Sequence, residues 1–328
     1  MASVKAIPIG LAVVALAAGW SAMHVVRASA ASSTVLQPAL WTVPDIASLP
    51  DDVWGRTVRK GHDLVLRTAA LIGPGATDPA RRFGGNGLDC QSCHIDGGTK
   101  KFGLPLVGSF AAYPAYRARS GSVGTIEDRV NGCLMRSLNG RPLPESGPEM
   151  TAIVAYLKFL STGQPVGRLT EGSGPGLMPE LARAADPVRG QQVYAGQCAV
   201  CHGVHGEGQG GSGQGYVAPP LWGPDSFNDG AGMARLTNAA NFIHNNMPNG
   251  TTWADPALSV TDAWDVAAYI EAQPRPHKAD LERDFPNRRE KPVDAAYGPY
   301  ADGFPASQHK FGPYAPIRAA IDALVARH

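Results

Sequence analysis

The sequence has almost no excess charge of either sign, because 29 basic residues face 28 acidic ones. It also lacks a block of Lys and Arg, so nucleic acid is not an expected partner. After residue 26 there is no apolar run long enough to span a membrane. Gly (39) and Pro (28) are plentiful, which indicates short helices joined by many loops. A length of 328 residues favours two domains over one.

The N-terminus has the features of an export signal. Lys5 supplies a positive charge, residues 7–22 form an apolar run, and Ala28-Ser29-Ala30 is typical of a cleavage site. We therefore predict a signal peptide over 1–30, cleaved near Ala30, and a periplasmic product. The alternative is an uncleaved anchor, because residues 7–26 are about long enough to span a bilayer. The protein would contact the membrane only in that case.

Cysteine is scarce, and four of the five residues fall into one repeated pattern, C-x-x-C-H. The two copies are Cys90-Gln91-Ser92-Cys93-His94 and Cys198-Ala199-Val200-Cys201-His202. This is the attachment signature of c-type haem: the two thiols bond the haem vinyl groups and the histidine becomes the proximal iron ligand. A redox C-x-x-C or half a zinc site would explain one copy but not two. We predict two covalently bound haem c groups.

A helix, a haem motif, a loop and a further helix occur in that order twice. This order is typical of an all-α protein made of two class I cytochrome c-like domains. A Gly/Pro-rich linker joins them, and an irregular C-terminal tail wraps the surface. The predicted divisions are 31–162 for the first domain, 163–185 for the linker, 186–273 for the second domain and 274–328 for an extended tail. The predicted helices are 49–71, 125–138, 149–160, 188–196, 235–246, 259–272 and 317–326.

The C-x-x-C-H pattern alone does not determine the distal iron ligands. Met247 follows His202 by 45 residues and precedes a proline, which favours it as the ligand of the second haem. Met233 and His244 are alternatives, although methionine often only fills a core and a histidine can simply face solvent. At the first haem Cys133, Met135 and Met150 remain open. Cys133 could equally be an inert buried thiol or a reactive nucleophile.

The predicted helix around Cys133 carries a group of polar side chains. Arg129, Cys133 and Ser137 lie four residues apart and share one helix face. Arg136 borders that face, and Arg119 precedes the helix. Guanidinium groups bind the oxygens of sulfur or phosphorus oxyanions, so the face is a candidate oxyanion pocket. The simpler interpretation is that the arginines bind haem propionates or are solvated.

Three stretches resemble di-haem thiosulfate dehydrogenases, over roughly residues 50–316. The strongest is the run around Cys133, and the approach to Cys90 and the tail are similar too. The matching segments are Arg129-Val-Asn-Gly-Cys133-Leu-Met-Arg136-Ser137-Leu-Asn-Gly140, Asn86-Gly87-Leu88-Asp89-Cys90-Gln91-Ser92-Cys93-His94, Lys291-Pro-Val-Asp294, Gly298-Pro-Tyr300 and Gln308-His-Lys-Phe-Gly-Pro313.

The resemblance implies an enzyme that couples two thiosulfates into tetrathionate and releases two electrons, with the reverse reaction known in some members. It implies His94 and Cys133 as ligands of the catalytic haem, and Arg119, Arg129 and Ser137 as the substrate pocket. Electrons would pass through the second haem to a small cytochrome or a similar carrier. Asn246 precedes Met247 where some members carry lysine, so plain His202/Met247 ligation is expected. The alternatives are a non-catalytic electron-transfer subunit of a sulfur-oxidising system, a di-haem peroxidase and an oxyanion sensor.

Overall fold

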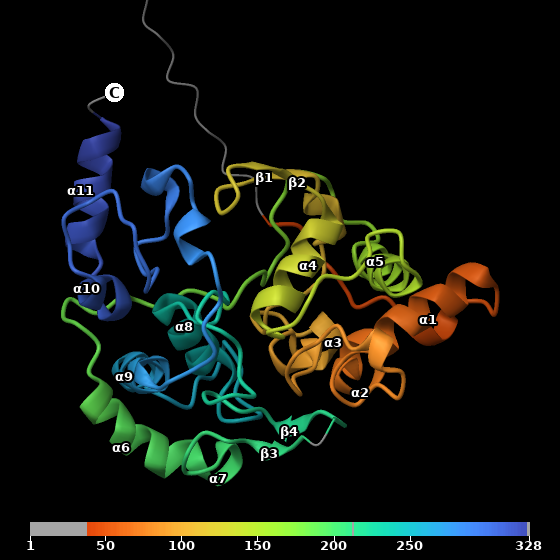
Figure 1. Cartoon of the computed structure of the whole chain (residues 1–328), viewed down its shortest axis with the longest axis horizontal. Helices are drawn as coiled ribbons and strands as arrows, with labels where there is room; N and C mark the ends of the chain where they lie inside the picture. Colours follow the sequence, from red (N-terminus) through yellow and green to blue (C-terminus); the bar gives the residue numbers. More distant parts are fainter. Residues whose placement is uncertain (1–37, 212, 327–328) are drawn as a thin grey trace, which may run out of the picture. The chain divides into compact units, whose positions relative to one another are not determined.

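Helices dominate the computed structural model, which describes residues 38–211 and 213–326 (Figure 1). Among these residues the strands form two small antiparallel sheets, each of two strands, so the prediction of a mostly helical chain is confirmed. The α-helices are α1 (Val53–Leu66), α2 (Thr68–Ile72), α3 (Ile95–Gly98), α4 (Ile126–Arg136), α5 (Pro148–Leu160), α6 (Pro187–Gln197), α7 (Ala199–His202), α8 (Leu236–Asn246), α9 (Val260–Ala272), α10 (Ala306–Phe311) and α11 (Ala315–Val325). The strands are β1 (Ala115–Arg117), β2 (Ser122–Gly124), β3 (Gln209–Gly210) and β4 (Tyr216–Ala218), and the 3-10 helices are η1 (Ile46–Ser48), η2 (Pro79–Arg81), η3 (Cys90–Ser92), η4 (Phe110–Ala112), η5 (Leu281–Arg283) and η6 (Arg288–Glu290).

Within the described ranges no helix is both long enough and apolar enough to cross a membrane. The predicted signal peptide lies outside those ranges.

Side-chain caps start several helices where the sequence predicts them. Thr125 accepts a hydrogen bond from the backbone of Asp128, and the Asp128 side chain accepts one in return from the backbone of Thr125. Asp186 and Ser259 likewise accept hydrogen bonds from backbone N–H groups in the first turns of α6 and α9. Each cap satisfies N–H groups that the first helical turn leaves without a partner. The three helices accordingly begin within one residue of the predicted position.

The prediction of one helix over 49–71 is wrong, because the helix breaks at Arg67 (φ −133°, ψ 42°). The break has a cause in the first haem motif. The Asp89 carboxylate accepts a hydrogen bond from the backbone N–H of Ala69 at 2.8 Å, which a continuous helix would use internally. The Thr68 hydroxyl accepts from the N–H of Cys90 at 3.0 Å. The start of α2 therefore anchors the motif.

Each half of the chain contains one close helix crossing, α1 against α5 and α6 against α9 (Figure 1). At the first crossing a Cβ on Gly61 would lie 1.9 Å from the carbonyl oxygen of Ala152. At the second a Cβ on Gly190 would lie 1.9 Å from the carbonyl oxygen of Asp265. Only glycine allows this approach. The repeated order predicted from the sequence thus reappears as a repeated packing contact.

The two halves share part of one core. Phe227, from the loop after β4, packs in the same hydrophobic cluster as Leu134 and Leu138 near α4. The Asn86 amide donates to the carbonyl oxygen of Ser226, and the Asn228 amide donates to that of Met135. A segment of the second half therefore forms one wall of the first, and the exact domain boundaries stay predictions.

The C-terminal tail contributes buried polar anchors. The structure contains the predicted helix near residue 317, as α11, and also α10, which the sequence did not predict. Asp294 is fully buried; it accepts hydrogen bonds from the backbone N–H of Thr237 and from Arg235. Because Arg235 gives α8 no side-chain cap, Asp294 supplies the cap from the tail.

The glycine crossings lead to a stability prediction. Gly61→Ala and Gly190→Ala should each lower the free energy of unfolding by about 1–3 kcal/mol, because the added methyl group overlaps a backbone carbonyl. Denaturant unfolding of the purified protein measures this. Gly196→Ala in α6 is the matched control: nothing lies within 4 Å of its Cβ position. This substitution should leave stability unchanged or raise it by up to ~1 kcal/mol. Equal losses in all three variants would contradict the close-crossing explanation.

Candidate functional site

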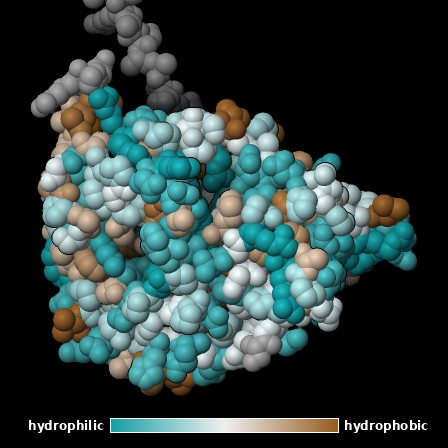
Figure 2. Space-filling model, viewed as in Figure 1, coloured by the Kyte–Doolittle hydropathy of each residue, from teal (hydrophilic) through white to brown (hydrophobic). Residues whose placement is uncertain are grey.

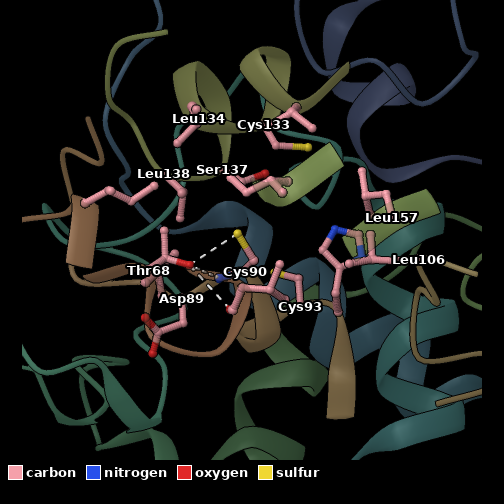
Figure 3. Close-up of a pocket in the computed structure, with 16 residues that line it drawn as sticks. Thr68, Asp89, Cys90, Cys93, Leu106, Cys133, Leu134, Ser137, Leu138 and Leu157 are labelled. Atoms are coloured by element: carbon pink, nitrogen blue, oxygen red, sulfur yellow. Dashed lines mark hydrogen bonds between the residues drawn. The ribbon is translucent and has the colours of Figure 1, made fainter. Parts of the chain in front are cut away.

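A cavity separates α4 from the first haem motif (Figure 3). Cys133, Leu134 and Ser137 project into it from α4, and Cys90 and Cys93 lie across from them. Most of its other lining is apolar: Val65, Ile72, Leu88, Leu106, Val130, Leu138, Ile153 and Leu157. An apolar chamber with a few sulfur, nitrogen and oxygen atoms at its edges is the kind of site that holds a large flat cofactor.

On the motif side both thiols are free and half-buried. Burial raises the pKa of the Cys90 and Cys93 thiols to about 12, so both are neutral before any bond to a cofactor forms. The Asp89 backbone N–H donates to the Ser92 hydroxyl at 3.1 Å, which holds the motif in a tight turn. The two sulfurs are thus presented from one turn to one side of the cavity.

A backbone carbonyl orients His94. Its Nδ1 donates to the carbonyl oxygen of Leu104 at 2.6 Å. Leu104 adopts a positive φ of 55°, a strained conformation for this residue type, and the strain serves to aim its carbonyl group. With Nδ1 occupied as a donor, Nε2 is left as the lone-pair nitrogen that an iron would bind.

Cys133, on α4, and His94 both line the cavity, and His94 is close enough to influence the Cys133 thiol. Burial raises the pKa of the Cys133 thiol, but the charge of Arg129 and the contact with His94 outweigh it. The net pKa is lowered to about 6. Arg129 Nη1 donates to the Cys133 Sγ at 2.7 Å, while the rest of the arginine is exposed to solvent. A thiolate is therefore favoured at neutral pH, beside a cation that solvent reaches.

The structure brings only some of the predicted substrate-pocket residues to the cavity. Cys133 and Ser137 line the cavity, and Arg129, on the same helix face, contacts it through its hydrogen bond to the Cys133 Sγ. Arg119 does not line it: its Nη1 donates to Asp284 at 2.8 Å and to Tyr297 at 3.0 Å. Arg119 reaches the site indirectly, because Asp284 also binds Arg136 of α4. No local pattern could have revealed Asp284, which lies 165 residues after Arg119.

Of the three side chains left open as distal ligands of the first haem, Cys133 alone lines the cavity. Met150 is fully buried in the hydrophobic core, and Met135 is half-buried on another side of α4. The geometry favours Cys133, although its bond to iron stays a prediction.

The second motif repeats the arrangement around the proximal histidine. His202 Nδ1 donates to the carbonyl oxygen of Pro219 at 2.7 Å, and burial lowers the pKa of the ring, which favours the neutral form. Cys198 packs against the core, whereas Cys201 is exposed. Both motifs thus fit a haem c with an axial histidine.

The three candidate distal ligands of the second haem lie in α8 or within three residues of its ends. Met247 directly follows α8 and is half-buried. Met233 packs against the cores of both halves, and His244 Nδ1 contacts the side-chain oxygen of Asn245 at 2.8 Å. Met247 as the ligand stays a prediction.

Comparisons with known proteins agree with the two motifs. Residues 79–166 match the family described as SoxA/TsdA, cytochrome c domain, and residues 187–274 match the family described as Cytochrome c. The predicted fold of two cytochrome c domains, which bind haem c, is thereby confirmed.

Relatives of known name are similar over most of the chain. A thiosulfate dehydrogenase from Thiomonas intermedia (strain K12) is 39% identical over 262 residues, which are 80% of this chain and 80% of that protein. One from Allochromatium vinosum is 41% identical over 72% of this chain and 84% of that protein. The solved thiosulfate dehydrogenase (TsdBA) from Marichromatium purpuratum is 37% identical with a TM-score of 0.67; the match covers 74% of this chain and about half (51%) of that one.

The site geometry leads to a spectroscopic prediction. Cys133→Ser in the haem-loaded protein should remove the thiolate signature from the ferric EPR and visible spectra, because Cys133 is the thiol aimed at His94. Met150→Leu is the control and should keep that signature, since Met150 packs outside the cavity lining. Persistence of the thiolate signature in the Cys133→Ser protein would rule out Cys133 as a ligand.

Proposed function

We propose a function from one premise: the chain belongs to the thiosulfate dehydrogenase family. It oxidises two thiosulfate ions to one tetrathionate and is an oxidoreductase. In this reaction one sulfur–sulfur bond forms between the two sulfane sulfurs, two electrons leave, and no atom is lost. The observation that carries the proposal is the hydrogen bond from Arg129 to the half-buried Cys133, at a cavity that His94 of the first haem motif also lines.

Charge explains why this site suits the reaction. Two dianions must approach each other, and their Coulomb repulsion opposes the bond. Arg129 is exposed beside the cavity and offers donors to sulfonate oxygens, and Ser137 adds a hydroxyl. Arg119, with its surplus donors, would assist from the end of α4. Cys133 lies where an incoming sulfane sulfur would meet it.

The residues that would hold the cofactors are assigned as follows. Cys90 and Cys93 would attach the first haem covalently, with His94 and Cys133 as its axial ligands. Cys198 and Cys201 would attach the second, with His202 and Met247. When bound, the two haems accept and pass on single electrons. Binding, orientation and charge compensation fall to the protein side chains.

The second half suits the exit of electrons. Cys201 is exposed, and the neighbouring Val200 keeps 75% of its surface accessible, so this motif opens to solvent more than the first. On the face in Figure 2 hydrophobic residues are scattered among hydrophilic ones, as is normal for protein surfaces. The acceptor would be a small cytochrome or similar carrier in the periplasm.

Turnover tests the function directly. The purified protein should reduce two ferricyanide for each tetrathionate formed from thiosulfate, as measured by absorbance and by ion chromatography of the product. Adding tetrathionate to the chemically reduced protein tests the reverse reaction. A protein that carries two haems but does not oxidise thiosulfate would instead be an electron-transfer subunit of a larger sulfur-oxidising system.

Arg129 leads to a kinetic prediction. Arg129→Gln should lower kcat/KM for thiosulfate by about 10- to 100-fold, because a charge-assisted hydrogen bond of roughly 1.5–3 kcal/mol is lost. Steady-state assays over a range of thiosulfate concentrations measure it. Arg141→Gln is the control: that guanidinium stacks on Phe83 and binds backbone carbonyls of residues 80 and 82. Equal losses in both variants would show that the effect is not specific to the site.

A further inference from the structure

Asp284, from the C-terminal tail, is the shared partner of two arginines beside the site. Arg119 Nη1 donates to its Oδ2 at 2.8 Å. Arg136 binds it with both terminal nitrogens, at 2.9 Å to Oδ2 and 2.7 Å to Oδ1. The Tyr297 hydroxyl donates to Oδ2 at 2.7 Å. A carboxylate with four donors is rigidly held, and it holds its partners in turn.

Phe285, the residue after Asp284, also contacts Arg119. The backbone N–H of Phe285 donates to the carbonyl oxygen of Arg119 at 2.8 Å, and the Arg119 guanidinium lies 5.0 Å from the centre of the Phe285 ring. Phe285 has a positive φ of 57°, which is unfavourable for an aromatic residue. The strained backbone is what places the carboxylate and the ring together around one guanidinium.

Asp284, Arg119, Arg136 and Tyr297 form a polar cluster that includes the last residue of α4, the helix of Cys133. Arg136 ends α4 and lies three residues after Cys133, next to Ser137, which lines the cavity. Arg119 and Arg136 also share the carbonyl oxygen of Gly230 as an acceptor, at 3.2 and 3.1 Å. Any displacement of the cluster therefore acts on the end of α4 that carries Ser137.

The charges in the cluster do not cancel. Two guanidiniums share one carboxylate, and all three side chains are mostly buried. Within the described residues the Nε and Nη2 groups of Arg119 donate to no protein acceptor, because its hydrogen bonds are all made by Nη1. The cluster keeps one net positive charge and an unused donor edge, which suits an oxyanion.

We propose that Asp284 is a positioning residue for the sulfur-oxyanion site. It fixes Arg119 and Arg136 at the end of α4 and leaves the Nε–Nη2 edge of Arg119 for the anion. This inference rests on the proposed function for its substrate. It assigns the tail a part in the reaction, although Asp284 lies far along the chain from both haem motifs.

Kinetics of the haem-loaded Asp284→Asn protein test the proposal. KM for thiosulfate should rise about 10- to 100-fold with a smaller change in kcat, because a misplaced guanidinium weakens binding of the anion. Asp284→Glu should recover part of the loss. If Asp284 acted only as a negative charge that repels substrate, KM would fall. A fall in KM, or a KM within about twofold of wild type, would overturn the positioning role.

Asp294→Asn is the matched control, since it removes another buried carboxylate of the tail that pairs with an arginine, Arg235. It should lower the melting temperature but leave KM unchanged. A KM rise in Asp294→Asn equal to that in Asp284→Asn would overturn the proposal in favour of general destabilisation.

A binding measurement separates this proposal from the function on which it rests. Thiosulfate is titrated into the ferric wild-type and Asp284→Asn proteins, and the visible spectrum is followed. If wild type binds thiosulfate without oxidising it, the proposed function fails, and weaker binding by Asp284→Asn still supports the positioning role. Equal affinities in the two proteins would overturn it.

Discussion

The contact between Arg129 and Cys133 is the interaction on which the rest of the site depends. A thiol inside an apolar cavity is normally kept neutral, because burial penalises its charged form. Here the guanidinium 2.7 Å away and the facing His94 reverse the balance and lower the pKa to about 6. Cys90 and Cys93 line the same cavity without such a cation, and burial raises their pKa to about 12. The difference in pKa between Cys133 and the two motif cysteines is thus electrostatic in origin.

The helix that supplies this contact is held at both ends. Thr125 and Asp128 cap its start, and at its last residue Arg136 is bound by Asp284 of the tail. Between these points α4 presents Cys133 to the cavity, and Ser137 follows directly after its last residue. A site that must keep cations close together needs rigid support, because their mutual repulsion would otherwise separate them. The tail supplies that support, and its buried Asp294 caps α8 in the other half.

Local signals predicted the parts of the structure that local forces control. The haem motifs, the starts of α4, α6 and α9, and the shared face of Arg129, Cys133 and Ser137 follow from spacings of a few residues. The sequence missed features that depend on distant contacts: the break at Arg67 is caused by Asp89, and the partner of Arg119 is 165 residues away. The β1–β2 hairpin and α10 were missed because short elements carry too little periodicity.

The two halves show how one framework serves two tasks. Both use a glycine at a helix crossing and a histidine whose Nδ1 is bonded to a carbonyl, so the framework for an axial histidine is the same. They differ in what faces that histidine. In the first half α4 brings a sulfur with its own cation, which makes the site attractive to anions. In the second half the residue before Met247 is Asn246, which is buried and uncharged. Its side-chain amide donates to the carbonyl oxygens of Phe102 and Phe242. This difference agrees with the proposal that the oxyanion binds in the first half and that the second half carries electrons.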